Sequence, residues 1–232
     1  MGGLFTQEGA HVVLAGVLET EGVQTVEAIR AQGGEVTFVK LDVTRAEDWQ
    51  KAVDSANSGD DIYINPGFYV ENVFIGPDDI RTLTIEGLGE PEEVIIDGNN
   101  EDRVFYIDWN DAEHYYLNNL TIQHGNASEG SAIYKSGPRG LYLNNVHILN
   151  NQVSGAGPFD NGGAIASMNN VGATLSLIDC VISGNNGSYT GGAVYYTGDD
   201  LYIEGCVISD NETDSYGAAL YARDYNSSTT IE

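Results

Sequence analysis

Basic residues are scarce in this sequence, and their scarcity narrows the range of partners. The 232 residues include nine lysines and arginines against 35 aspartates and glutamates, so the formal net charge is −26. A chain this negative repels phosphate backbones and anionic lipid headgroups. We therefore predict no nucleic-acid partner and no membrane-surface partner.

Cysteines and long apolar runs are also lacking. Two cysteines exclude a disulfide scaffold and a four-cysteine zinc site. No apolar run approaches the roughly 20 residues of a membrane-spanning helix, and residues 1–16 lack the basic start and apolar stretch of a secretory signal. With 41% hydrophobic residues, we expect a soluble globular chain of one or two domains without membrane insertion.

The composition changes near Asn57. Residues 57–232 hold 26 of the 35 acidic residues and most of the glycine, asparagine and tyrosine. Residues 1–56 instead show apolar runs of alternating strand and helix type, and the helix at 45–56 is introduced by the capping-box sequence Thr44-Arg45-Ala46-Glu47. The predicted elements are a strand at 11–15, a helix at 21–32, a strand at 36–41 and a helix at 45–56.

Three motifs mark the first segment: FTQEGAHVVLA at residues 5–15, AQGG at 31–34 and LDVT at 41–44. Together they resemble a short-chain dehydrogenase, from the end of its first helix through its second and third strands. By this resemblance Asp42 would lie beside the adenine of a nucleotide. We interpret residues 1–44 as a truncated Rossmann-like βαβ segment.

Much of that family's machinery has no counterpart in the sequence. No strand precedes the residues that match the end of the family's first helix. The glycine-rich turn that would hold a pyrophosphate on the N-terminus of that helix therefore has no counterpart. Gly16 stands where the family usually places an acidic residue, and no tyrosine is followed four residues later by lysine. One hypothesis is therefore a remnant of an NAD-dependent short-chain dehydrogenase without its active site.

The second segment repeats a short apolar phrase four times. The successive spacings are 26, 34 and 26 residues, and such recurrence with intervening turns is typical of stacked parallel strands. Each interior position should become a column of similar side chains. Three columns are predicted: Leu117, Leu143, Leu177 and Ile203; Leu120, Val146, Cys180 and Cys206; Ile122, Ile148, Ile182 and Ile208.

Polar residues fall between these columns. Asn118 and Asn119, with Asn144 and Asn145 in the next repeat, are expected at a bend where side-chain amides can satisfy turn backbone.

This segment resembles the right-handed parallel β-helix repeat family, which includes polymorphic outer-membrane proteins and the pectate-lyase-like superfamily. The resemblance implies an all-β right-handed parallel β-helix of about six coils over residues 57–232. The helix at 45–56 would cap it, and a small α/β segment would precede it. The repeat region ends without a cap at Glu232, so we interpret the chain as truncated, a fragment or a chimera.

Carboxylates cluster between residues 97 and 113. Enzymes of the pectate-lyase superfamily use such groups with calcium or as acid and base, and oxygen-rich turns can bind Ca²⁺. The alternative is an ordinary turn in a very acidic chain. The candidate metal ligands, with Ca²⁺ as the cofactor, are Asp97, Asp102, Asp108 and Asp111. No catalytic residue is assigned, and His124 is interpreted as a turn residue.

Tyrosines form a second candidate site. Tyr116, Tyr142 and Tyr202 precede inward residues on successive repeats, so alternation points them outward, with Ser176 interrupting the row. They either bind sugar rings by stacking or pack against one another as strand-formers. Cys180 and Cys206 are interpreted as free thiols, since parallel in-register geometry strains a disulfide.

The leading functional hypothesis is a non-catalytic surface or secreted β-helix module for adhesion or carbohydrate binding. Its partner would be a polysaccharide or cell-surface glycan, and the family resemblance implies an extracellular location. The first alternative is a polysaccharide lyase or glycoside hydrolase. The second alternative is the dehydrogenase remnant.

Overall fold

The computed structural model describes residues 11–16, 19–31, 35–40, 47–76, 82–108, 114–154, 161–224 and 229–232. Its first part alternates strands and helices. Strand β1 pairs in parallel with strand β2 on one side and with β3 on the other. The elements are β1 (His11–Gly16), α2 (Glu19–Arg30), β2 (Glu35–Lys40), α3 (Glu47–Ser55) and β3 (Asp60–Ile64).

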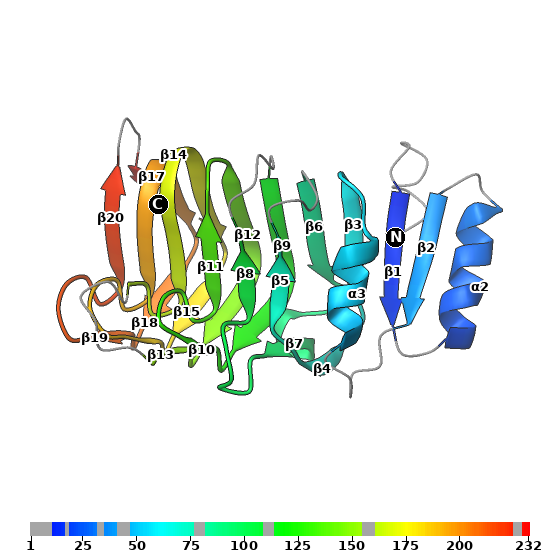
Figure 1. The fold of residues 1–232 in the computed structure, drawn as a ribbon, viewed down its shortest axis with the longest axis horizontal. Coiled ribbons are helices and arrows are strands. Elements are labelled where there is room, and N and C mark those ends of the chain that lie inside the picture. The colour runs from blue at the N-terminus through cyan, green and yellow to red at the C-terminus, as the bar shows by residue number, and fades with distance from the viewer. Residues whose placement is uncertain are drawn as a thin grey trace.

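The rest of the described chain is built from short strands and one 3₁₀ turn. In Figure 1 the strands follow one another along the long axis of the molecule, from β2 near one end to β20 at the other. The elements are β4 (Gly67–Val70), β5 (Val73–Ile75), β6 (Thr82–Gly87), η2 (Pro91–Glu93), β7 (Val94–Asp97), β8 (Phe105–Ile107), β9 (His114–Gln123), β10 (Asn126–Ala127), β11 (Ile133–Ser136), β12 (Gly140–Leu149), β13 (Gln152–Val153), β14 (Ile165–Ile178), β15 (Val181–Ser183), β16 (Asn186–Gly187), β17 (Val194–Glu204), β18 (Val207–Ser209), β19 (Glu212–Thr213), β20 (Leu220–Asp224) and β21 (Thr229–Ile231).

The strands pair in the register that the repeated phrase predicts. Leu117 lies opposite Leu143, Leu143 opposite Leu177, and Leu177 opposite Ile203. The isoleucines that begin at Ile122 form a second column through the parallel pairs of β9, β12, β15 and β18. These two predicted columns are confirmed, and their upstream members are buried side chains of one continuous hydrophobic core.

The bends between paired strands recur at fixed positions and use left-handed backbone. One such column is Asn119, Asn145, Asp179 and Gly205, with φ of 55°, 53°, 51° and 62°. Asparagine, aspartate and glycine are the residues that tolerate this conformation best. The Asn145 side-chain amide also donates to the Asn119 side-chain oxygen across 3.0 Å, as predicted for the bend.

Helix α3 packs on the first strands of the core. Trp49 is buried, and its ring meets Tyr69 and Phe105 edge-on at centroid distances of 5.8 and 6.4 Å. On the same helix, the Gln50 side chain accepts from the Phe74 N–H at 2.9 Å and donates to the Phe74 carbonyl at 2.7 Å. Gln50 thereby supplies the hydrogen bonds that a neighbouring strand would give this part of β5.

The structure corrects the predicted fold class, an all-β right-handed parallel β-helix over residues 57–232. The described strands form one 17-stranded sheet that already includes β1 and β2, and a separate 4-stranded sheet of β10, β13, β16 and β19. The large sheet is parallel and curled into a half-barrel with few helices, closer to an α/β fold. The repeat was informative about which strands pair. Parallel pairing is shared by many sheet architectures, however, so it did not decide the fold class.

Candidate functional site

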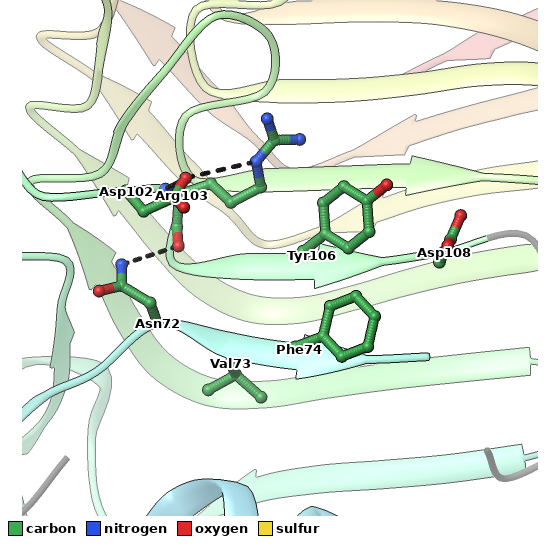
Figure 2. Close-up of a pocket in the computed structure, with 7 residues that line it drawn as sticks. All are labelled: Asn72, Val73, Phe74, Asp102, Arg103, Tyr106 and Asp108. Atoms are coloured by element: carbon green, nitrogen blue, oxygen red, sulfur yellow. Dashed lines mark hydrogen bonds and ion pairs between the residues drawn. The ribbon is translucent and has the colours of Figure 1, made fainter. Parts of the chain in front are cut away.

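A pocket of about 410 Å³ opens between β5, β8 and the turn before β8 (Figure 2). We call it the arginine–tyrosine pocket. Parallel pairing sets Phe74 beside Tyr106 and Tyr106 beside Tyr134, so their side chains share one face. The rings stack, with centroids 5.4 and 5.3 Å apart and planes within 12°. The lining residues are Asn72, Val73, Phe74, Asp102, Arg103, Tyr106 and Asp108.

Arg103 lies across this stack. Its guanidinium carbon is 4.9 Å from the ring centroids of both Tyr106 and Tyr134, which is cation–π geometry. Its Nε lies 3.7 Å from Asp102, and its backbone carbonyl accepts from the Asn72 side chain at 2.9 Å. Burial raises the pKa of Tyr134, and the Arg103 charge opposes that rise. The pocket therefore combines an aromatic wall, one fixed cation and a carboxylate rim.

Among the described residues, the predicted metal ligands do not form a group of three that could hold a metal ion. Asp97 is buried, and its carboxylate accepts from the Gln123 side chain, the His124 ring nitrogen and the Asn99 N–H at 2.7, 2.7 and 2.8 Å. Although burial raises its pKa, these hydrogen bonds outweigh that effect and lower it. Its oxygens are thus already engaged by protein donors.

Two of the other predicted ligands lie in the arginine–tyrosine pocket. Asp102 and Asp108 line it, and Asp102 accompanies Arg103 there. Asp111 falls outside the described residues. Within the described ranges, no group of three or more His, Cys, Asp or Glu side chains could hold a metal ion.

The predicted tyrosine row is partly assembled. Tyr116 and Tyr142 stack with centroids 4.9 Å apart and an interplanar angle of 17°. Ser176 lies opposite Tyr202, so it separates Tyr202 from the stacked pair as expected. Tyr202 donates to Glu204 instead, and this hydrogen bond raises its pKa to about 12. The pair of rings supports the alternative of packing between neighbouring strands.

Sequence reasoning missed two polar arrangements. The Asp97–His124 contact joins adjoining repeats, and His124 has a left-handed φ of 52°. An asparagine ladder runs through the buried Asn151 and Asn185 to the partly buried Asn211. A signal for the ladder exists, because each asparagine follows the isoleucine of the repeated phrase by three residues.

The dehydrogenase-like motifs are only partly within the described residues. Gly16 is the last residue of β1, whereas Asp42 lies outside the described part of the chain. The described unit β1–α2–β2 has the strand–helix–strand order of half a nucleotide-binding fold. Fold and site together define a parallel-sheet protein with an α/β beginning and an aromatic pocket on its repeat region.

Comparison with known proteins finds dehydrogenases. The chain is 42% identical over 52 residues to 2,5-dichloro-2,5-cyclohexadiene-1,4-diol dehydrogenase LinX of Sphingobium indicum, which is 22% of this chain and 21% of that protein. It is 46% identical over 52 residues to cyclopentanol dehydrogenase of Comamonas testosteroni, with the same shares. The chain thus spans about a fifth of the length of these relatives. No family model matches the chain, and no solved structure matches it.

These findings correct the predicted family. No finding supports the right-handed β-helix repeat family for residues 45–232, and the relatives found are dehydrogenases. The pectin-lyase-like, cell-surface and extracellular descriptions rested on that resemblance, and the carbohydrate-binding description rested on it together with the tyrosine row. These descriptions are corrected along with the family. The predicted resemblance to a dehydrogenase segment agrees with the relatives found, and the matched length is close to that of the segment.

None of the described helices is long and apolar enough to cross a membrane.

Proposed function

We propose that this chain is a non-catalytic protein in which the β1–α2–β2 unit is a remnant of an NAD-dependent short-chain dehydrogenase. In this proposal the unit covers one edge of a large parallel sheet. The observation that carries it is the pairing of β1 with β3, from Val12 opposite Asp61 to Ala15 opposite Ile64.

The pairing matters because of strand order in dinucleotide-binding folds. There the second strand lies between the third and the first, and the first leads into the glycine-rich turn that holds the pyrophosphate. By the dehydrogenase resemblance, β1 and β2 correspond to the second and third strands. The place of the first strand is taken by β3, which continues through Asn65-Pro66 into strand β4 rather than into a glycine-rich turn and helix. A pyrophosphate cradle has no room at this position.

The packing also supports a covering role. Ile62 and Ile64 point into the large core, while Tyr63 between them packs with Val26, Ile29 and Val36 of the N-terminal unit. Strand β3 therefore contributes to two cores, one on each face. An uncovered β3 edge would present unpaired N–H and C=O groups to other chains, and β1 pairs with them.

The experiment is a titration of the full chain with NADH, followed by nicotinamide fluorescence and by calorimetry. A complete short-chain dehydrogenase serves as the positive control. We expect no saturable binding. We also expect no NADH formation when NAD⁺ is supplied with cyclopentanol, the alcohol in the name of one relative. Saturable NADH binding by the folded chain would contradict the proposal.

A further inference from the structure

The two cysteines lie opposite each other in adjoining repeats. Ile178 pairs with Glu204 before them, and Val181 pairs with Val207 after them, both in parallel. Cys180 and Cys206 therefore occupy the same position one strand spacing apart, at about 4.8 Å. That spacing falls within the range of Cα separations found in disulfides, although the parallel in-register arrangement strains such a bond. Both thiols are free.

The two cysteines lie at a bend, where the Val207 N–H donates to the Cys180 carbonyl at 2.8 Å and holds the adjoining repeats together. Cys180 lies between β14 and β15, and Cys206 lies between β17 and β18, so neither belongs to a strand. The Cys206 sulfur leans toward the neighbouring repeat, 3.4 Å from the Cys180 backbone nitrogen and 3.4 Å from the Leu177 carbonyl. Rotation of the Cys180 side chain away from the Leu143 and Ile178 carbonyls would bring the sulfurs together.

The two thiols differ in access and in acidity. Cys180 is buried, whereas Cys206 is only partly buried. The neighbouring Cys180 thiol, aided by the Cys180 backbone N–H, lowers the pKa of Cys206. The neighbouring Cys206 thiol and burial raise the pKa of Cys180. Since the thiolate is the nucleophile, the accessible sulfur is also the more reactive one.

We propose that Cys206 and Cys180 form a thiol–disulfide exchange site for small-molecule disulfides such as oxidised glutathione. The Cys206 thiolate attacks one sulfur of the small disulfide, forming a mixed disulfide and releasing one small thiolate. The Cys180 thiol then attacks the Cys206 sulfur, and its proton passes to the second small thiolate as that group leaves. In balance, two protein thiols are oxidised to one disulfide, and one small disulfide is reduced to two small thiols.

The test uses the full folded chain, oxidised glutathione and intact mass spectrometry without reductant. The variants are Cys180→Val and Cys206→Val. Valine is the residue of this column one repeat earlier, at Val146, so both variants suit the fold. Thermal unfolding of each variant checks that it is folded.

We expect the wild-type chain to lose the mass of two hydrogens without retaining glutathione. Cys180→Val should retain one glutathione, because the mixed disulfide at Cys206 has no resolving thiol. Cys206→Val should stay unmodified until urea is added.

Three results would each overturn the proposal. The wild type could react only in urea, which would make both thiols inert core residues. It could keep glutathione without closing, which would remove the role of Cys180. Cys206→Val could react as fast as the wild type, which would remove the role of Cys206.

Discussion

The side-chain amide of Asn151 donates to the side-chain oxygen of Asn185 in the next repeat across 3.0 Å, and both residues are buried. The Asn185 oxygen also accepts from the Asn151 backbone N–H at 2.9 Å. The Asn185 amide in turn donates to the Ile148 carbonyl at 3.0 Å and to Asn211 at 2.9 Å. One side chain thus satisfies several buried polar groups at this bend.

We expect Asn185→Leu to be strongly destabilising. Leucine is similar in size but leaves the Asn151 backbone N–H without its partner and removes the hydrogen bonds to the Ile148 carbonyl and to Asn211, at about 1–3 kcal/mol for each buried group left unpaired. The Asn151 side-chain amide keeps its hydrogen bonds to the Ile122 and Leu149 carbonyls. The free energy of unfolding in urea should fall by roughly 3 kcal/mol or more. The matched control is Asn186→Ala, since Asn186 is the next residue and is exposed; it should change stability by less than about 0.5 kcal/mol. Equal losses in the two variants would show that the ladder contributes little.

The burial of Lys135 leads us to predict that the free energy of unfolding rises as the pH becomes alkaline. Its side chain is fully buried, and its ammonium nitrogen donates to the carbonyls of Gly137 and Arg139 at 2.5 and 2.9 Å. Burial lowers its pKa to about 7, whereas the unfolded chain keeps an ordinary lysine pKa near 10.4. Between these values the unfolded state binds more protons, so the free energy of unfolding increases as pH rises.

The expected gain between pH 7 and pH 10 is on the order of 4 kcal/mol, at about 1.4 kcal/mol for each pH unit. Above pH 10 the buried tyrosines decrease the free energy of unfolding. Tyr69, for example, has its pKa raised to about 12 by burial, so ionisation then favours the unfolded chain. Urea unfolding at a series of pH values measures the slope. Lys135→Met should flatten it, and the exposed Lys51→Met should not; a slope that survives Lys135→Met would refute the assignment.

Substitution of Tyr63 tests the packing contact between the N-terminal unit and the repeat region. Its ring is buried with Val26, Ile29 and Val36, so Tyr63→Ala should cost about 3–5 kcal/mol of unfolding free energy. Phe68→Ala removes a ring that is 49% exposed and should cost much less. Hydrogen exchange should also quicken at the β1 and β2 amides. If Tyr63→Ala matched Phe68→Ala, the two parts would not share a packed core.

Arg103 tests the arginine–tyrosine pocket. The guanidinium lies over Tyr106 and Tyr134 and lowers the pKa of Tyr134 against the effect of burial. Arg103→Gln should therefore raise the pKa of Tyr134 and cost about 0.5–1 kcal/mol of stability. Ultraviolet titration of phenolate absorbance measures the first effect. Arg223→Gln, on an exposed arginine of β20, is the control, and an unchanged titration in Arg103→Gln would refute the contact.

Part of the fold could be predicted from the sequence because the apolar phrase of residues 117–208 repeats. Apolar residues recurring every 26 to 34 positions predicted which leucines and isoleucines face one another, and the pairing of Leu117 with Leu143 confirms it. The bend position was accessible for the same reason, since asparagine, aspartate and glycine recur there with left-handed backbone. The asparagine ladder carried the same periodic signal and could have been predicted.

The sites were less accessible because they join residues without a shared pattern. Asp97 belongs to an acidic run that favoured calcium, yet its oxygens are engaged by Gln123 and His124 of the next repeat. Likewise, the pocket brings Phe74 and Arg103 together across 29 residues. An acidic composition gives the number of carboxylates. It does not indicate which carboxylates already accept hydrogen bonds from other residues of the protein.

The sequence by itself determined the strand pairs and their bends, because each repeat places the same residue types at the same position. Only the tertiary structure decided that β1 pairs with β3, so that the dehydrogenase-like unit and the repeats share one sheet. It also decided that Cys206 leans toward Cys180. Register follows from local periodicity, whereas the joining of unlike segments depends on which edges and apolar faces remain unpaired once each segment has folded.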